Sequence, residues 1–186
     1  MLFDEKIVAI ERTLSTRDVP HAFGGANALA YYGTPRATAD IDLNVFVAVS
    51  RAREVLEVLA ELGVTAPDPG ILERVEREGQ ITVYWERTPI DVFFSYDPLH
   101  ESSMQRRRRV DFGGDPIHVL SAEDLMVYKV LFNREKDWSD IAEMIYAANE
   151  SLDFEYVRGW IERICGVGPQ LERLQRVIDS AGRDVG

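Results

Sequence analysis

Three aspartates in the first half of the sequence have the spacing of a metal-binding site. Asp40 and Asp42 begin residues 40–47, where polar and apolar residues alternate at first, which is typical of a β-strand. Because strand side chains alternate between faces, both carboxylates leave one face while Ile41 and Leu43 are buried on the other. Two bare carboxylates about 5 Å apart repel by roughly 3 kcal/mol at an effective dielectric near 20, so the pair favours a bound cation.

Asp91 is the third acid. It interrupts the otherwise apolar stretch Pro89-Ile90-Asp91-Val92-Phe93-Phe94, where a carboxylate needs a partner. If its strand neighbours the strand of Asp40, the three carboxylates converge and hold either two cations or one cation and a general base. Oxygen ligands without His or Cys favour Mg²⁺ or Mn²⁺.

Gly24-Gly25 lies upstream of the acids, between a short apolar stretch and a predicted helix at residues 26–32. Glycines let backbone N–H groups approach a phosphate, and a helix N-terminus adds partial positive charge. The order of a phosphate cradle, paired acids and a third acid fits triphosphate binding, metal bridging and activation of a nucleophile.

This order resembles the signature of the DNA polymerase β-like nucleotidyltransferase superfamily. Residues 23–30 and 33–42 resemble more closely the AbiEii-type toxins of type IV toxin–antitoxin systems, among them the mycobacterial tRNA-modifying toxins. Many superfamily members have Gly-Ser where this chain has Gly24-Gly25, so phosphate binding here must rest on backbone amides and cations.

The resemblance continues to about residue 145. Lys129, Arg134 and Lys136-Asp137 are similar to the late Lys and Arg/Lys-Asp motif of the toxin family. It implies transfer of a nucleoside monophosphate from an NTP to an RNA, a tRNA 3′ end, which blocks aminoacylation and translation. It also implies an NTP co-substrate and a cognate antitoxin.

The resemblance assigns roles to individual residues. It gives metal binding to Asp40 and Asp42, and metal binding or base catalysis to Asp91. Lys136 joins them as a catalytic residue. The residues expected to contact the nucleotide or its phosphates are Gly24, Gly25, Arg36, Thr38, Lys129 and Asp137.

Plainer interpretations exist for the late basic residues. Lys129 interrupts an apolar helix and can extend its amine from the edge of the core to water. Lys136 and Asp140 have the i, i+4 spacing of an ordinary surface pair. Thr38 carries a separate hypothesis, because its phosphorylation would add negative charge beside the three acids and exclude the NTP.

The surrounding elements predict an α+β protein with the nucleotidyltransferase fold: a mixed, mostly antiparallel sheet flanked by helices, then a helical bundle. Residues 1–120 are expected to form the α/β core and residues 121–186 a helical region that completes the active-site cleft. We expect strands at 80–85 and 89–95, joined by a short loop, and at 106–112 and 116–120. Helices are expected at residues 3–16, 50–62, 70–78, 121–133, 135–148, 153–165 and 169–180.

Composition limits the partners. The net charge of −11 argues against indiscriminate nucleic-acid binding, although the run Arg106 to Arg109 is either a local RNA-facing patch or a solvated edge strand. The acidic N-terminus and the lack of a long apolar run predict a cytoplasmic protein with no membrane partner.

Two other functions remain open. One is nucleotidyl transfer to a protein or a small molecule, as in AMP-transferring antitoxins or antibiotic-modifying enzymes. The other is an inert binding domain, which loss of one acid would indicate. All three acids are present.

Overall fold

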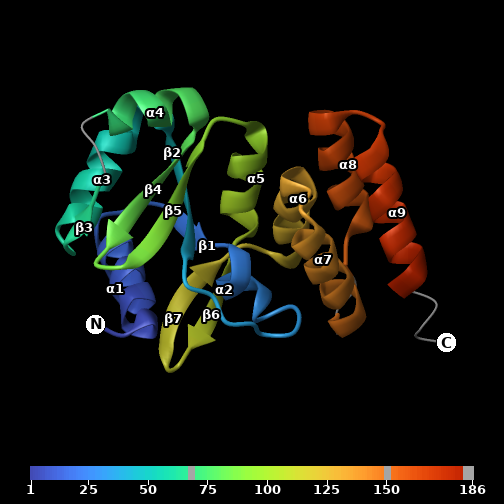
Figure 1. Cartoon of the computed structure of the whole chain (residues 1–186), viewed down its shortest axis with the longest axis horizontal. Helices are drawn as coiled ribbons and strands as arrows, with labels where there is room; N and C mark the ends of the chain where they lie inside the picture. Colours follow the sequence, from blue (N-terminus) through green and yellow to red (C-terminus); the bar gives the residue numbers. More distant parts are fainter. Residues whose placement is uncertain (67–69, 149–151, 182–186) are drawn as a thin grey trace. The chain divides into compact units, whose positions relative to one another are not determined.

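A seven-stranded mixed sheet organises the first half of the protein in the computed structural model, which describes residues 1–66, 70–148 and 152–181. Its strand order is β3-β4-β5-β2-β1-β7-β6 (Figure 1). Pairing is parallel between β1 and β7 and between β2 and β5, and antiparallel elsewhere, which confirms the expected mixed, mostly antiparallel sheet. The strands are β1 (His21–Phe23), β2 (Ile41–Ala48), β3 (Val64–Thr65), β4 (Gln80–Trp85), β5 (Thr88–Ser95), β6 (Arg108–Phe112) and β7 (Asp115–Val119).

Helices account for most of the remaining described residues. Those before residue 121 are α1 (Phe3–Thr16), α2 (Gly25–Leu29), the 3₁₀ turn η1 (Val49–Arg51), α3 (Ala52–Ala60), α4 (Ile71–Glu78) and α5 (Pro98–Arg106). The later helices are α6 (Ala122–Phe132), α7 (Glu135–Ala147), α8 (Phe154–Cys165) and α9 (Pro169–Ala181). None of the helices in the described ranges is long and apolar enough to cross a membrane.

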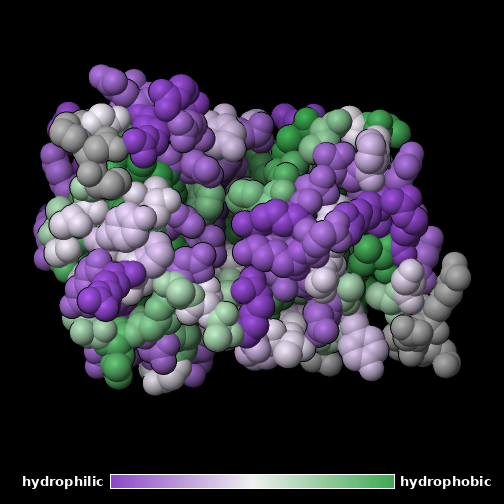
Figure 2. Space-filling view, viewed as in Figure 1, coloured by the Kyte–Doolittle hydropathy of each residue, from purple (hydrophilic) through white to green (hydrophobic). Residues whose placement is uncertain are grey.

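The chain divides into two units. The first comprises Met1–Asn27 and Ala37–Leu120 and holds the sheet, whereas the second comprises Ala28–Arg36 and Ser121–Gly186 and holds α6 to α9. The segment Ala28–Arg36 therefore belongs with the late helices although it lies near the N-terminus. Figure 2 shows hydrophilic side chains over much of the visible face of the helical unit, as expected of amphipathic helices packed on one another.

Periodic burial explains why these segments form these elements. In α1, Ile7, Ile10 and Leu14 follow the helical period and are fully buried, as the sequence predicted. In β5, Ile90 and Val92 are fully buried and Asp91 is not, which is the alternation of a strand with one face in the core.

The structure differs from the sequence-based expectations at several points. Ser50 does not cap a helix, because it lies inside η1 and α3 begins only at Ala52. The helix expected at 26–32 is the shorter α2. The strand expected at 106–112 begins at Arg108, since α5 runs through Arg106.

The unexpected helix α5 has a recognisable start. The side chain of Asp97 accepts the N–H of Leu99, and Pro98 occupies the first turn. As a result the arginine run has no single face: Arg106 ends a helix, Arg107 is a connector, and Arg108 and Arg109 are exposed on the edge strand β6.

Candidate active site

Asp42 and Asp91 lie opposite each other on neighbouring strands. β2 and β5 run parallel, with Asp42 paired with Asp91. Partners in a ladder point to the same face, and that face is opposite the one on which Ile41 and Ile90 are fully buried. The two strands thus bring the second and third acids of the predicted triad onto one surface of the sheet.

Gly25 fits closely over the carboxylate of Asp42. A Cβ built on Gly25 would lie 1.7 Å from Asp42 Oδ2, and Gly25 has a φ of +48°. Gly24 donates its backbone N–H to the carbonyl of Asp42 at 2.9 Å. Only a residue without a side chain permits this approach, so the Gly-Gly backbone and the Asp42 carboxylate form one surface.

Asp40 lies in a bend just before β2, so the strand that the sequence predicted from Asp40 begins one residue later. The carboxylate of Asp40 accepts a hydrogen bond from the hydroxyl of Thr38, two residues earlier. Thr38 is half-buried and contacts Asp40 directly. The carboxylate oxygens of Asp40, Asp42 and Asp91 do not all lie within 4.8 Å of one another. Among the described residues, a different group of potential metal ligands meets that spacing, and it is described below.

Thr82 contributes a contact that sequence analysis missed. It lies opposite Asp91 on β4, and its hydroxyl donates a hydrogen bond of 2.6 Å to Asp91 Oδ1. This bond holds one carboxylate oxygen and fixes the rotation of the side chain. Thr82 was identifiable only from the exact register of the β4–β5 hairpin.

Lys129 lies in the helical unit, where it is buried between two acids of α7. Its ammonium lies 2.6 Å from Asp140 Oδ2 and 3.9 Å from Asp137 Oδ1. Asp140 also pairs with Arg36 at 3.4 Å. Asp140 therefore pairs with both Lys129 and Arg36. Lys129 is only 4 % exposed, so it is buried with its partners.

Asp137 is buried at the start of α7. It accepts hydrogen bonds from Arg134 Nε and Nη2 at 2.7 and 3.1 Å, and one from the backbone N–H of Arg134. Asp137 thereby orients one cation and faces a second, Lys129. Lys136, its neighbour in sequence, is exposed. The predicted late motif therefore has two parts: Lys129, Arg134 and Asp137 form a cluster of ion pairs around a buried carboxylate, and Lys136 is exposed to solvent.

The group that meets the 4.8 Å spacing is Glu11, His21 and His118. No sequence pattern assigns a role to Glu11, His21 or His118, because the three residues are far apart along the chain. Only the packing of α1 against β1 and β7 brings them together.

A family described as "Nucleotidyltransferase of unknown function (DUF6036)" matches residues 6–170, a span that includes all three aspartates. The chain belongs to this family. A search of curated proteins finds no match to the sequence.

Solved structures share the fold of this nucleotidyltransferase at low sequence identity. A crystal structure of ANT(2″)-Ia in complex with adenylyl-2″-tobramycin has 13% identity and a TM-score of 0.55, with 98% of each chain covered. A solution structure of the same antibiotic-resistance factor has 14% identity and a TM-score of 0.54, covering 98% of this chain and 95% of that one. A candidate nucleotidyltransferase from H. pylori has 14% identity and a TM-score of 0.51, covering 97% and 92%. These likenesses confirm the nucleotidyltransferase fold.

Proposed function

We propose that this nucleotidyltransferase moves a nucleoside monophosphate from an NTP to an acceptor hydroxyl, with Asp40, Asp42 and Asp91 holding Mg²⁺ or Mn²⁺. The observation that carries the proposal is the pairing of Asp42 with Asp91 beneath the Gly25 backbone. The donors are all carboxylate oxygens, which suit these hard cations. A cation bound there would neutralise charge on the triphosphate and polarise its phosphorus.

The chain's own residues account for the remaining chemistry. The acceptor oxygen attacks the α-phosphorus and forms a new O–P bond, while the bond to the bridging oxygen breaks and pyrophosphate leaves with its electron pair. Where Asp91 acts as the base instead of as a metal ligand, its Oδ2 takes the acceptor's proton, since Thr82 already donates to Oδ1. Backbone amides at Gly24-Gly25 bind phosphate.

Arg36, Lys129 and Lys136 are the proposed cationic contacts to the phosphates, with Asp137 orienting a cation. Lys136 is supported by its exposure. Lys129 must first leave its close pair with Asp140, so its part in phosphate binding requires a rearrangement within the helical unit.

We further propose an RNA acceptor, a tRNA 3′ end, with a cognate antitoxin and a cytoplasmic setting. The support is the resemblance of residues 23–42 and of the late motif to AbiEii-type toxins. Arg108 and Arg109, exposed at consecutive positions of the edge strand β6, place positive charge on both faces of that strand, where a phosphate backbone could contact either one.

A small cationic acceptor is the second candidate, and the net charge of −11 favours it. An acidic surface attracts a polycation and repels RNA. The ANT(2″)-Ia complex contains adenylyl-2″-tobramycin on the same fold, which supports a small-molecule acceptor as the second candidate.

The test is incubation of the full chain with labelled NTPs and Mg²⁺ in the presence of tRNA, total RNA, aminoglycosides or protein. Label is expected in tRNA from the wild type and from Glu57→Gln, an exposed acid on α3, and not from Asp42→Asn. Label in aminoglycosides alone rejects the RNA proposal and supports the second candidate. Transfer that persists in Asp42→Asn contradicts the assignment of the acids.

Thr38 is the proposed regulatory site. Its hydroxyl donates to Asp40, so a phosphate there would remove that donor and set a dianion against the carboxylate. Mass spectrometry of protein co-expressed with its neighbouring genes is expected to find phosphorylated Thr38 together with lost transfer. Unmodified Thr38 under all such conditions contradicts the idea.

A further inference from the structure

A second group of titratable residues lies where α1 meets β1 and β7. Glu11 is 6 % exposed and His21 is 2 % exposed, whereas the side chain of His118 retains 27 % of its exposure. His21 pairs with Val45 in the ladder, so it points to the sheet face opposite that of Asp42. The group is therefore separate from the aspartates.

Both ring nitrogens of His21 face hydrogen-bond acceptors, which a neutral imidazole cannot satisfy without an added cation. Its Nδ1 lies 2.8 Å from the carbonyl oxygen of Val19, and a carbonyl can only accept, so Nδ1 carries a proton. Its Nε2 lies 3.0 Å from Glu11 Oε2, which also only accepts when ionised. A neutral imidazole has a single N–H, so either a second proton or a metal ion must lie between Nε2 and the carboxylate.

The arrangement around the carboxylate fits a metal ion. His118 presents Nδ1 2.8 Å from Glu11 Oε1, and the three ligand atoms all lie within 4.8 Å of one another. Zinc bonds to His nitrogen and carboxylate oxygen at about 2.0–2.2 Å, so two of its tetrahedral ligands lie about 3.4 Å apart. The histidine nitrogens, 3.0 and 2.8 Å from the carboxylate oxygens, would therefore need to move outward by only a few tenths of an ångström to admit the ion. The Val19 carbonyl fixes the ring of His21 with Nε2 toward the site, as backbone carbonyls do behind metal-bound histidines.

Hydrogen bonds hold the carboxylate of Glu11 in position for the same role. The backbone N–H of His118 donates to Oε2 at 2.9 Å, and Ser15 donates to Oε1 at 2.9 Å. The carboxylate is therefore held in place before any metal arrives.

We propose that Glu11, His21 and His118 form a zinc site that ties α1 to β1 and β7, with water from the exposed side of His118 as a further ligand. Two imidazole nitrogens and one carboxylate favour zinc over magnesium. The oxygen-only aspartates have the opposite preference. Zinc here holds α1 on the sheet face opposite the aspartates and takes no part in nucleotidyl transfer.

The experiment uses the full chain without a polyhistidine tag, stripped with a chelator, incubated with zinc and desalted. Bound zinc is measured by mass spectrometry, and the midpoint of thermal unfolding is measured with zinc or magnesium. We expect one zinc ion per chain and a midpoint that rises with zinc but not with magnesium. His118→Gln should weaken zinc binding by more than about tenfold and still fold, because His118 is partly exposed.

Controls separate this site from the rest of the protein. Asp4→Asn, an exposed acid on α1, should keep the zinc, and Glu11→Gln should lose it. Zinc retained in His118→Gln, or no stoichiometric zinc in the wild type, overturns the proposal and leaves a doubly protonated His21 in a buried ion pair. Zinc lost in Asp42→Asn but kept in Glu11→Gln also overturns it, since the metal would then lie at the aspartates.

Discussion

At the scale of single residues, each candidate acid has a neighbour that restricts it. Gly25 packs its bare Cα against the carboxylate of Asp42, and Thr82 fixes one oxygen of Asp91. The hydroxyl of Thr38 does the same for Asp40. Catalytic groups held in one orientation need little reorganisation when substrate binds, so these neighbours should influence activity more than stability.

Gly25→Ala should abolish nucleotidyl transfer, because its Cβ would overlap Asp42 Oδ2 at 1.7 Å. Gly113→Ala is the matched control. Gly113 has a φ of +64° with nothing within 4 Å, so it reports backbone strain alone, about 1–2 kcal/mol. Transfer assays and urea unfolding measure the two effects. Equal activity in both variants would show that the close approach to Asp42 has no role.

Thr82→Val should lower kcat by about 10-fold to 100-fold with a small change in stability, since it removes the donor that orients Asp91. Thr82→Ser keeps a hydroxyl and should recover most of the rate. Steady-state kinetics with the identified acceptor provide the measurement. If Val and Ser have the same kcat, Thr82 has no positioning role.

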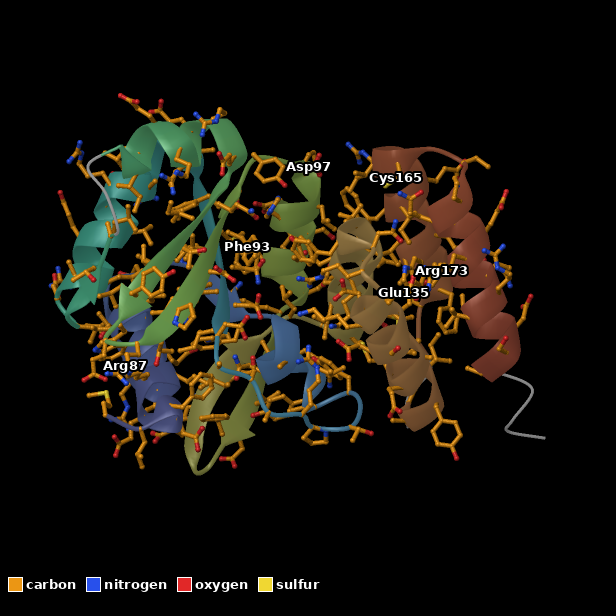
Figure 3. The ribbon with its side chains drawn as sticks, viewed as in Figure 1. Arg87, Phe93, Asp97, Glu135, Cys165 and Arg173 are labelled. Atoms are coloured by element: carbon orange, nitrogen blue, oxygen red, sulfur yellow. The ribbon has the colours of Figure 1, made fainter. Side chains whose placement is uncertain are left out.

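At the scale of elements, ion pairs join the late helices. Lys129 of α6 pairs with Asp140 of α7. Arg173 of α9 pairs with Glu135 of α7, and Figure 3 shows these two residues close together. Arg173 also lies over the ring of Trp138, 4.7 Å from its centroid. Removing one partner should cost much more at the buried pair than at the exposed one, because it leaves a buried charge without its partner, whereas solvent screens Glu135.

Lys129→Met should destabilise the protein by about 3–5 kcal/mol, because it leaves Asp140 buried with a weaker partner. Asp140→Asn should destabilise the protein in the same way, because it leaves Lys129 buried with a weaker partner. The double variant should recover part of the loss, with a coupling energy of about 1–3 kcal/mol from a double-mutant cycle in urea. Strict additivity of the two losses would mean that the pair is not a unit.

The start of α5 should make stability depend on pH. Burial lowers the pKa of His100 from 6.5, opposed by its hydrogen bond to the Asp97 carbonyl and by the charge of Asp97. The unfolded chain therefore binds the proton more tightly. The contribution of neutral His100 to the free energy of unfolding is complete above pH 6.5, and it is lost as the pH falls through the lowered pKa of the folded state. Below pH 6.5, the free energy of unfolding, measured with denaturant, should fall less steeply with pH in His100→Phe than in the wild type. The same dependence on pH in both proteins would contradict the lowered pKa of His100.

At the scale of the whole molecule, charge is the property that bears on the acceptor. The protein carries −11, yet two arginines of the sheet unit are exposed on edge strand β6. An RNA acceptor must use such local patches against an unfavourable overall field, whereas a cationic acceptor benefits from that field. The two candidates therefore predict opposite responses to loss of a surface arginine.

If RNA is the acceptor, Arg109→Ala should raise KM for tRNA and reduce the dependence of log KM on log salt by about one. Arg53→Ala, an exposed arginine on α3, serves as the control and should change neither. Transfer assays over a salt series measure both quantities. A lower KM for a cationic acceptor in Arg109→Ala would favour the second candidate instead.

The sequence by itself determined the features that follow from local backbone geometry. A strand alternates its side chains, so the sequence predicted Ile41 in the core, and Ile41 is fully buried, although Asp40 itself lies in a bend before β2. Helical periodicity and Ser121 as an N-cap likewise located α1 and α6. These rules need only neighbouring residues.

Tertiary structure decided which distant residues meet. The hairpin turn uses Glu86 and Arg87 alone, one residue fewer than expected, which places Thr82 rather than Val83 opposite Asp91. Glu11, His21 and His118 likewise meet only through the packing of α1 on the sheet. Such contacts depend on register and packing across the fold, for which no local periodicity carries a signal.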